Sequence, residues 1–243
     1  KKKIKKLEYN LRILFNKMNI KKRDNILLHS NSAGLLQFMN NIKSFDIFFR
    51  YLKRRVGENG SIVIPTYNYN FTNKKIFDYE KSRSQVGLLS NYFLKKFPKR
   101  RTLNPIFSHL IIGKKFNFLL KKTDYELLGK KSIFSTFENE NFKIICFCCQ
   151  PSKITFLHYL ESKNKVPYRF NKIFKGKIYF KGKLISSEIR YYVGKKNINY
   201  TLTNKNLIKI PDSKNFIKAS FGRFFCYCVS AKYLAKVIKK KLQ

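Results

Sequence analysis

A histidine and a glutamate three residues apart are the clearest candidates for chemistry in this chain. His158 and Glu161 fall in the segment Thr155-Phe-Leu-His-Tyr-Leu-Glu161. If the segment is helical, both side chains lie on one face, so the carboxylate can accept the ring proton and fix the tautomer. The other ring nitrogen is then free to act as a general base. The alternative is an ordinary helix, in which the histidine makes a local hydrogen bond and the glutamate faces solvent.

Small polar side chains beside His29 form a second candidate. An apolar segment, residues 25–29, runs into His29-Ser30-Asn31-Ser32, whose backbone N–H groups and hydroxyls could surround a phosphate or a thioester. The alternative is a loop histidine with ordinary hydrogen bonds. The sequence has no Gly-rich phosphate loop, no dinucleotide fingerprint and no Gly-x-Ser-x-Gly motif. Ser108-His109 begins a later strand, and alternation directs one of these two side chains toward a site.

The elements that must position these residues follow a strand–loop–helix order. The apolar segments typical of buried strands are residues 25–29, 61–65, 107–113, 142–149 and 222–229. The segments with helical apolar spacing are residues 3–18, 43–56, 86–97, 154–163 and 230–242. This alternation predicts an α/β fold with a mainly parallel central sheet flanked by helices. Ligands of such sheets bind at the carboxyl ends of strands, so His29–Ser32 and Pro65–Asn68 should converge.

A hairpin and the chain length complete the expected architecture. Residues 173–193 alternate apolar and polar side chains around Lys181-Gly182-Lys183, which predicts a small antiparallel insertion. No repeat and no Gly/Ser linker divides the 243 residues. We therefore expect residues 1–243 to form a single α/β domain.

Basic residues dominate the composition. The 53 Lys and Arg against 13 Asp and Glu give a net charge of +40, which is typical of proteins that bind nucleic acid or an anionic surface. However, 42 of the 53 are Lys, whereas Arg is the better reader of phosphates and bases. Lys, Asn, Ile, Phe and Tyr make up 129 of the 243 residues, a bias that A/T-rich codons produce. We attribute most of the charge to this drift and expect no specific nucleic-acid partner.

The five cysteines fit a buried core better than a metal site. Their spacings, Cys-x-Cys-Cys from Cys146 to Cys149 and Cys-x-Cys from Cys226 to Cys228, lack the two-residue gap of a zinc knuckle. We expect reduced, metal-free thiols, which suit a reducing cytoplasm. No apolar run reaches the ~18 residues of a membrane span, and no signal peptide is visible after the first lysines.

Five segments form an ordered set of motifs across nearly the whole chain. They are Asn25-Ile-Leu-Leu-His-Ser-Asn31, Gly60-Ser-Ile-Val-Ile-Pro-Thr-Tyr67, Arg101-Thr-Leu-Asn-Pro-Ile-Phe-Ser108, Thr155-Phe-Leu-His-Tyr-Leu-Glu161 and Ala219-Ser-Phe-Gly222. In this order they resemble motifs of the aminoglycoside 3-N-acetyltransferase family, among them a strand ending in His-Ser-Ser and a Thr-x-x-His-x-x-Glu helix. Each motif is weak alone, but the order of all five is fairly specific.

The resemblance implies direct transfer of an acetyl group from acetyl-CoA to an amine, without a covalent enzyme intermediate and without a metal. It implies that His158 is the base and Glu161 its orienting partner, with Thr155 at the thioester or substrate and Ser108 near the reacting carbonyl. The residues it implies for the CoA channel are His29, Ser30, Asn31, Ser32, Pro65 and Thr66. We expect His29, Thr66, Ser108 and His158 to line one cleft.

One position departs from the family pattern, because Asn104-Pro105 stands where the family has His-Pro. An amide cannot titrate, so Asn104, a candidate substrate-binding residue, should redirect specificity or abolish activity. Arg169 could meet a phosphate or carboxylate of the substrate, or form a surface salt bridge. Because carboxylates are scarce, an amino sugar for surface polysaccharide suits this chain better than a polycationic antibiotic, so a role in antibiotic resistance is the less expected one. A homodimer is possible. The alternatives are a basic protein on nucleic acid or an anionic surface, and a decayed homologue without activity.

Overall fold

Two β-sheets and the helices around them organise this protein, a computed structural model of which describes residues 1–122, 125–196, 198, 202, 207, 209–210 and 212–242. The strands are β1 (Asn25–Ser30), β2 (Ser61–Pro65), β3 (Phe77–Asp78), β4 (His109–Gly113), β5 (Lys143–Phe147), β6 (Arg169–Phe180), β7 (Lys183–Gly194), β8 (Phe216–Phe221) and β9 (Phe224–Ser230). The helices are α1 (Lys2–Lys17), α2 (Ala33–Leu36), α3 (Lys43–Val56), α4 (Leu88–Lys96), α5 (Phe116–Leu120), α6 (Ile133–Asn139), α7 (Phe156–Lys163) and α9 (Ala231–Leu242). Three short 3₁₀ helices are η1 (Phe71–Asn73), η2 (Pro98–Arg100) and η3 (Pro151–Lys153).

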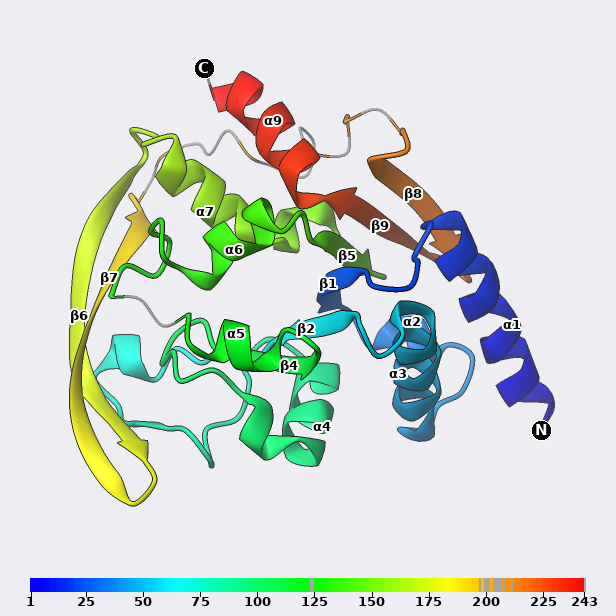
Figure 1. The fold of residues 1–243 in the computed structure, drawn as a ribbon, viewed down its shortest axis with the longest axis horizontal. Coiled ribbons are helices and arrows are strands. Elements are labelled where there is room, and N and C mark those ends of the chain that lie inside the picture. Colours follow the sequence, from blue (N-terminus) through cyan, green and yellow to red (C-terminus); the bar gives the residue numbers. More distant parts are fainter. Residues whose placement is uncertain are drawn as a thin grey trace.

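The larger sheet has the strand order β4-β2-β1-β5-β9-β8 (Figure 1). At its centre β1 is parallel to both neighbours, and Leu27 pairs with Val63 of β2 and with Ile144 of β5. The outer pairs β2–β4, β5–β9 and β9–β8 are antiparallel. Four of the six strands, β1, β2, β5 and β8, therefore run in one direction, which confirms the mainly parallel sheet. The single last strand predicted at 222–229 is corrected to the antiparallel pair β8 and β9.

Side-chain alternation along the central strands separates two apolar clusters, one on each face of this sheet. Leu27 and Ile144 belong to the cluster that contains residues of α6, α7 and α9. Their neighbours Ile26 and Ile145 point the other way, into the cluster that contains residues of α1 and α3. Because successive strand residues face opposite sides, these short apolar runs are covered on both faces, as in other α/β proteins.

The predicted hairpin is confirmed and is longer than expected. Strands β6 and β7 pair along their whole length, from Phe180–Lys183 to Arg169–Gly194, and β3 joins β6 in parallel. The hairpin lies at one end of the molecule, and α1 and β8 lie at the other (Figure 1). It approaches η1 closely at Gly176, where a Cβ atom would come within 2.9 Å of the Phe71 ring. This contact explains a glycine in the middle of a strand.

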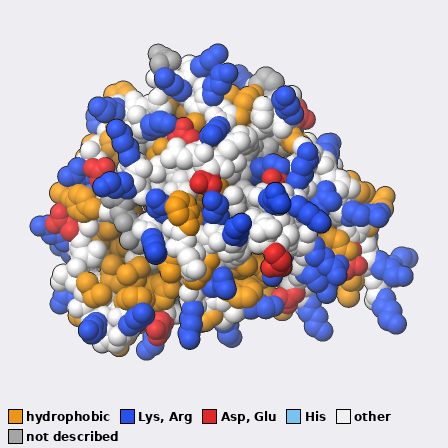
Figure 2. All heavy atoms as spheres, in the orientation of Figure 1, with side chains coloured by type: hydrophobic (Ala, Val, Ile, Leu, Met, Phe, Trp, Pro, Cys, Tyr) orange, Lys and Arg blue, Asp and Glu red, His pale blue; other side chains and the backbone are white. Residues whose placement is uncertain are grey.

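Most basic side chains lie on the outside, while Arg101 and Arg169 are buried, and those on the face in view (Figure 2) are not collected into one region. Figure 2 shows Lys and Arg spread over the whole visible face, with a few acidic groups among them. On this face, the distribution fits drift in composition better than a dedicated nucleic-acid surface. Within the described part of the chain, no helix is long and apolar enough to cross a membrane.

Candidate active site

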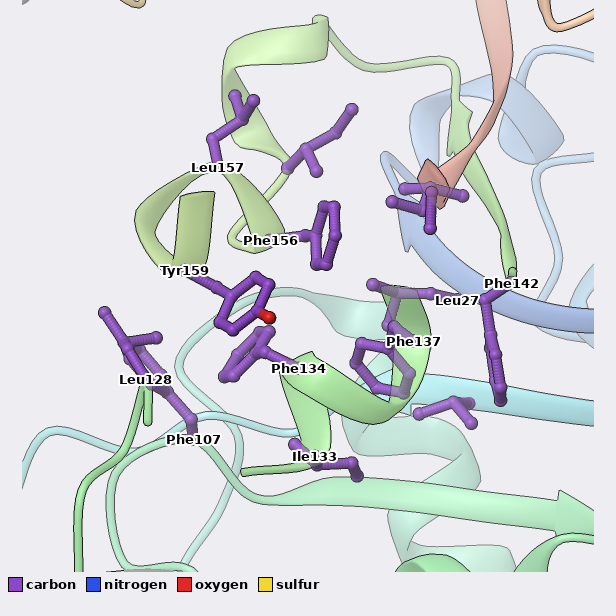
Figure 3. Close-up of a cluster of buried hydrophobic side chains, with 14 of the residues drawn as sticks. Leu27, Phe107, Leu128, Ile133, Phe134, Phe137, Phe142, Phe156, Leu157 and Tyr159 are labelled. Carbon is purple, nitrogen blue, oxygen red and sulfur yellow. The ribbon is translucent and has the colours of Figure 1, made fainter. Parts of the chain in front are cut away.

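Helix α7 carries the histidine–glutamate pair and is fixed by its aromatic side chains. Phe156 and Tyr159 are buried and lie among the rings of Phe134 and Phe137 from α6 (Figure 3). The rings of Phe156 and Tyr159 are 5.3 Å apart, so this part of the helix cannot rotate without opening the core. His158 lies between the two aromatic residues in sequence and reaches a pocket, because consecutive helical residues point in different directions.

The His158 ring is held on one edge by two buried charged groups. Its Nδ1 atom lies 3.0 Å from Oε2 of Glu161 and 2.7 Å from Nη2 of Arg169. Nε of Arg169 lies 2.7 Å from the same Oε2 atom. The Tyr168 hydroxyl donates to Oε1 of Glu161 at 3.2 Å, and Arg169 donates to the Tyr192 carbonyl at 3.1 Å. The side chains of Glu161 and Arg169 are only 3% and 6% exposed, whereas His158 is 35% exposed. The ionic pair is thus a buried support for a half-exposed imidazole.

This geometry gives the His158 ring two proton arrangements. When Nδ1 carries the proton, it donates to Glu161, and Nε2 has a free lone pair that can accept a proton from a substrate. When Nε2 carries the proton, Nδ1 accepts a hydrogen bond from Arg169. The two contacts favour opposite tautomers: Glu161 favours the proton on Nδ1, which leaves Nε2 free as a general base needs, and Arg169 favours the proton on Nε2. The guanidinium also holds the carboxylate in place.

A pocket of about 520 Å³ lies at the carboxyl ends of β1 and β2, beside α7. Seven of the predicted site residues line it: His29, Ser30, Asn31, Ser32, Pro65, Thr155 and His158. Its volume is in the range that holds one small ligand. The sequence-based expectation that the β1 and β2 ends converge is confirmed.

His29 contributes a neutral imidazole to this pocket. Its side chain is 7% exposed, and burial lowers its pKa to about 4. Its Nε2 atom is buried and has no hydrogen-bond partner among the described residues. A buried polar atom without a partner is rare in proteins and is usually satisfied by a ligand or water. His29 is therefore suited to hydrogen-bond an uncharged or anionic ligand, not to carry a positive charge.

A second buried histidine lies beneath the pocket floor. The Tyr67 hydroxyl is 3.1 Å from Nε2 of His109 and also interacts with the Thr155 side chain. Burial is the main cause that lowers the His109 pKa to about 3 and raises the Tyr67 pKa. Both groups are uncharged at neutral pH, and Tyr67 connects the floor of the pocket to the start of α7.

Thr66 and Ser108 lie behind the pocket and do not line it. Both are fully buried, and their hydroxyls are 3.1 Å apart. Arg101, itself 0% exposed, donates to the Ser108 hydroxyl at 2.9 Å and to the Thr66 carbonyl at 2.7 Å. It also donates to the Ser82 carbonyl at 2.6 Å. Burial lowers the Arg101 pKa to about 10, so this cation stays charged at neutral pH and joins the pocket wall to the sheet. Of the four residues expected in one cleft, His29 and His158 are there.

The sequence matches one protein-family model, described as aminoglycoside 3-N-acetyltransferase, over residues 27–243. The chain belongs to this family. The match confirms the resemblance stated above and, with it, the class of acyltransferase.

Solved structures of the family share the fold at low sequence identity. AAC-IIIb in a binary complex with CoASH aligns with a TM-score of 0.80 and 14% identity, over 98% of this chain and 97% of that one. Aminoglycoside acetyltransferase AAC(3)-IIb aligns at 0.78 and 15% identity, over 98% and 96%. AAC-VIa bound to sisomicin aligns at 0.76 and 14% identity, over 99% and 97%. None of the curated proteins compared with the sequence matches it.

Asn104, which replaces the histidine of the family motif, lies away from the pocket. Its Oδ1 atom accepts hydrogen bonds from the backbone N–H groups of Ile106 and Phe107, at 3.0 and 2.7 Å. Its side chain closes a turn ahead of β4, a common use of Asn. Asn104 does not line the pocket beside His158, and its Oδ1 atom is engaged with its own backbone, so its role in substrate binding stays a prediction.

The expected surface position of Arg169 requires a correction. It was expected at a substrate phosphate or in a surface ion pair, but its guanidinium is buried behind His158 and meets Glu161. A sequence does not show which carboxylate an arginine reaches when the partner lies on the preceding helix. Arg169 thus holds the Glu161 carboxylate beside the His158 ring.

Several pocket residues were not predicted. They are Leu28, Tyr69, Val86, Gly87, Leu88, Ser90, Cys149, Ser152 and Lys153, whereas Tyr67 belongs to the Pro65–Asn68 segment that was expected to reach the site. Gly87 has a φ of +133°, a conformation that glycine adopts readily, and it directly precedes α4. A glycine directly before an apolar helical segment was the feature of the sequence that could have indicated this part of the pocket wall. The described residues contain no group of three or more His, Cys, Asp or Glu side chains that could hold a metal ion.

Proposed function

We propose that this protein transfers the acetyl group of acetyl-CoA to the amine of an amino sugar, with His158 as the general base. The observation that carries the proposal is the buried support of His158 at the edge of a ligand-sized pocket. Glu161 and Arg169 together fix the orientation of the ring, and the tautomer that donates from Nδ1 to Glu161 leaves Nε2 free, as a base requires. The family's complex with CoASH supports acetyl-CoA as the donor.

The reaction uses few groups of this chain. The amine nitrogen attacks the thioester carbon, a C–N bond forms, and the C–S bond to CoA breaks. Nε2 of His158 accepts the proton that the nitrogen loses, and the resulting imidazolium is stabilised by the Glu161 carboxylate. The imidazolium then returns the proton to the departing thiolate. Thr155, at the start of α7, and the neutral His29 supply hydrogen-bond groups to the same space.

The charge of the pocket favours an acceptor that is not a polycation. Among the described residues that line it, Lys153 is the one with a full charge at neutral pH, and none is a carboxylate. The ammonium groups of a polycationic aminoglycoside would lie against a pocket wall that has no carboxylate to neutralise them. An amino sugar with one amine, carried on an anionic nucleotide, matches this wall. Tyr67 and Tyr69 add aromatic surface against which a sugar ring can pack.

The test is an acetyl-transfer assay that follows release of the CoA thiol with three acceptors. The rate of thiol release should be higher with glucosamine or UDP-glucosamine than with sisomicin, which is the polycation. His158→Ala should lower turnover by about 10²–10⁴-fold, the usual range for a lost general base. Near-normal turnover by His158→Ala would refute the assignment of the base, and a preference for sisomicin would refute the acceptor class.

A matched control separates lost chemistry from lost binding. His158→Ala should still be stabilised against heat by acetyl-CoA as wild type is, because a ligand that binds the folded form raises Tm. His109→Gln is not a suitable control, since that histidine is part of the core. Lys177→Ala removes a side chain from the exposed face of β6 and should leave turnover unchanged.

A further inference from the structure

A second pocket adjoins the first, and we propose that it binds the phosphate groups of a ligand whose reacting end lies beside His158. The pocket has a volume of about 540 Å³ and contains three cationic side chains, Lys81, Arg83 and Lys95. The proposal rests on the function proposed above and extends it to a phosphate-bearing ligand. Acetyl-CoA and a nucleotide-linked acceptor share this chemistry, so the experiment must distinguish the two.

The two pockets have one lining residue in common. Leu88, the first residue of α4, lines both of them. Ser90 of the same helix faces the first pocket, and Lys95 faces the second. The helix rises about 1.5 Å per residue, so Lys95 lies roughly 10 Å along its axis from Leu88. A ligand that exceeds the first pocket can therefore pass Leu88 and place its far end among the cations.

The cations of the second pocket are not neutralised by ion pairs. In the part of the chain that the structure describes, none of Lys81, Arg83 and Lys95 lies within salt-bridge distance of a carboxylate. Glu80 also lines the pocket, which leaves an excess of two positive charges there. Lysine is common on the surface of this protein, but three cationic side chains around one pocket, next to the pocket of His158, can together bind an anionic group.

The loop that carries two of these cations is held in shape before any ligand arrives. The Ser82 carbonyl accepts a hydrogen bond from buried Arg101 at 2.6 Å, and Asn68 donates to the Arg83 carbonyl at 2.8 Å. Asn91 of α4 accepts from the backbone N–H of Ser84 at 2.8 Å. These bonds fix the backbone on both sides of Arg83. A preformed site loses less entropy on binding than a mobile loop does.

The test measures binding, so it does not depend on turnover. Calorimetric titrations compare CoA with pantetheine, its phosphate-free part, and UDP-glucosamine with glucosamine. The variants are Arg83→Ala, Lys95→Ala and their combination, with Lys177→Ala as a control that removes one exposed charge from outside the residues that line the pocket. Each single variant should weaken the phosphate-bearing ligand about threefold, and the double variant about tenfold, as for exposed charge pairs. The loss should shrink as salt concentration rises.

The outcomes separate the two sources. A loss for CoA but not for pantetheine assigns the pocket to the donor, and a loss for UDP-glucosamine but not for glucosamine assigns it to the acceptor. Equal losses for phosphate-bearing and phosphate-free ligands, or losses no larger than those of Lys177→Ala, overturn the proposal. If wild type binds neither CoA nor UDP-glucosamine, the proposed function has failed. Titration with inorganic pyrophosphate then tests the second pocket independently of the proposed function. Pyrophosphate binding that is weaker in the double variant supports the phosphate site. No binding, or binding that the double variant does not change, overturns it.

Discussion

Replacing Arg169 with methionine should both destabilise the protein and disable the base. The substitution keeps an unbranched side chain of similar length but removes the cation that faces Glu161 at 2.7 Å. The carboxylate, 3% exposed, would then be buried without its opposite charge. Breaking a buried ion pair on one side typically costs about 3–5 kcal/mol. In a chain of this length each kcal/mol shifts Tm by about 2–4 °C, so we expect a fall of roughly 6–20 °C.

A double-mutant cycle tests whether the pair itself causes this effect. Glu161→Gln alone leaves Arg169 buried, with the Tyr192 carbonyl and the imidazole as partners. The double variant Arg169→Met/Glu161→Gln buries no unpaired charge and should lose less stability than the two single variants combined. The shortfall should be about 1–3 kcal/mol, the range for residues in direct contact. Urea and thermal unfolding give both values.

The control is a similar ion pair on the surface. Arg190 and Glu126 are 2.8 Å apart, but both side chains are substantially exposed. Arg190→Met should leave Tm close to that of wild type, because exposed pairs contribute little. If the losses of Arg169→Met and Glu161→Gln are additive within about 0.5 kcal/mol, the two residues are not coupled and our account of the site is wrong. Turnover should fall in Arg169→Met while CoA affinity is retained.

Three further outcomes follow from the same structure. Glu161→Gln should lower turnover less than His158→Ala, because an amide oxygen still accepts from Nδ1 but does not stabilise an imidazolium; equal losses in the rate assay would contradict this role. Cys149 is the one partly exposed thiol of the five and lines the pocket, so a maleimide should label it first, and acetyl-CoA should protect it; mass spectrometry identifies the site, and labelling unaffected by acetyl-CoA would place the ligand elsewhere. Burial lowers the pKa values of His29 and His109 to about 4 and 3, below the 6.5 of an unfolded histidine, so the unfolded chain binds more protons below pH 6.5. The stability that these residues contribute is thus complete above pH 6.5. As the pH falls from 6.5 to the folded-state pKa of each histidine, the free energy of unfolding decreases by up to about 1.4 kcal/mol per pH unit for each one. His109→Gln should make the urea-unfolding free energy depend less steeply on pH between pH 6.5 and 4, and an unchanged dependence would refute this origin.

The local elements were readable from the sequence because their apolar spacing is strong. The predicted helix at 43–56 and the strand at 61–65 match α3 and β2 residue for residue. Strand β8 was missed, since Phe-Ile-Lys-Ala-Ser-Phe is short and carries a lysine and a serine in its centre. The direction of β4 and β9 was also not readable, because apolar runs look alike in parallel and antiparallel strands.

The site was readable where neighbouring residues act together and not where distant segments meet. His158 and Glu161 are three residues apart on one helix, so their contact follows from helical geometry. Ser108 and His109 posed a choice that alternation alone could not settle. The structure turns both inward, Ser108 toward Arg101 and His109 toward Tyr67, and neither of the two reaches the pocket. Those partners lie seven and 42 residues away in the chain.

The support of His158 also bears on when the protein can become competent during synthesis. The pocket walls come from four stretches of the chain, residues 28–32, 65–69, 86–90 and 149–158, all of which precede the β6–β7 hairpin. The orientation of His158 needs Arg169, and Arg169 is itself held by the Tyr192 carbonyl of β7. A nascent chain that ends within the β6–β7 hairpin contains every residue that lines the pocket, but it lacks the carbonyl that holds Arg169 as well as β8, β9 and α9. Because β9 and α9 contribute to the sheet and the core, and because a domain generally folds as a unit, the pocket and the oriented base should form together, after the last helix has been made.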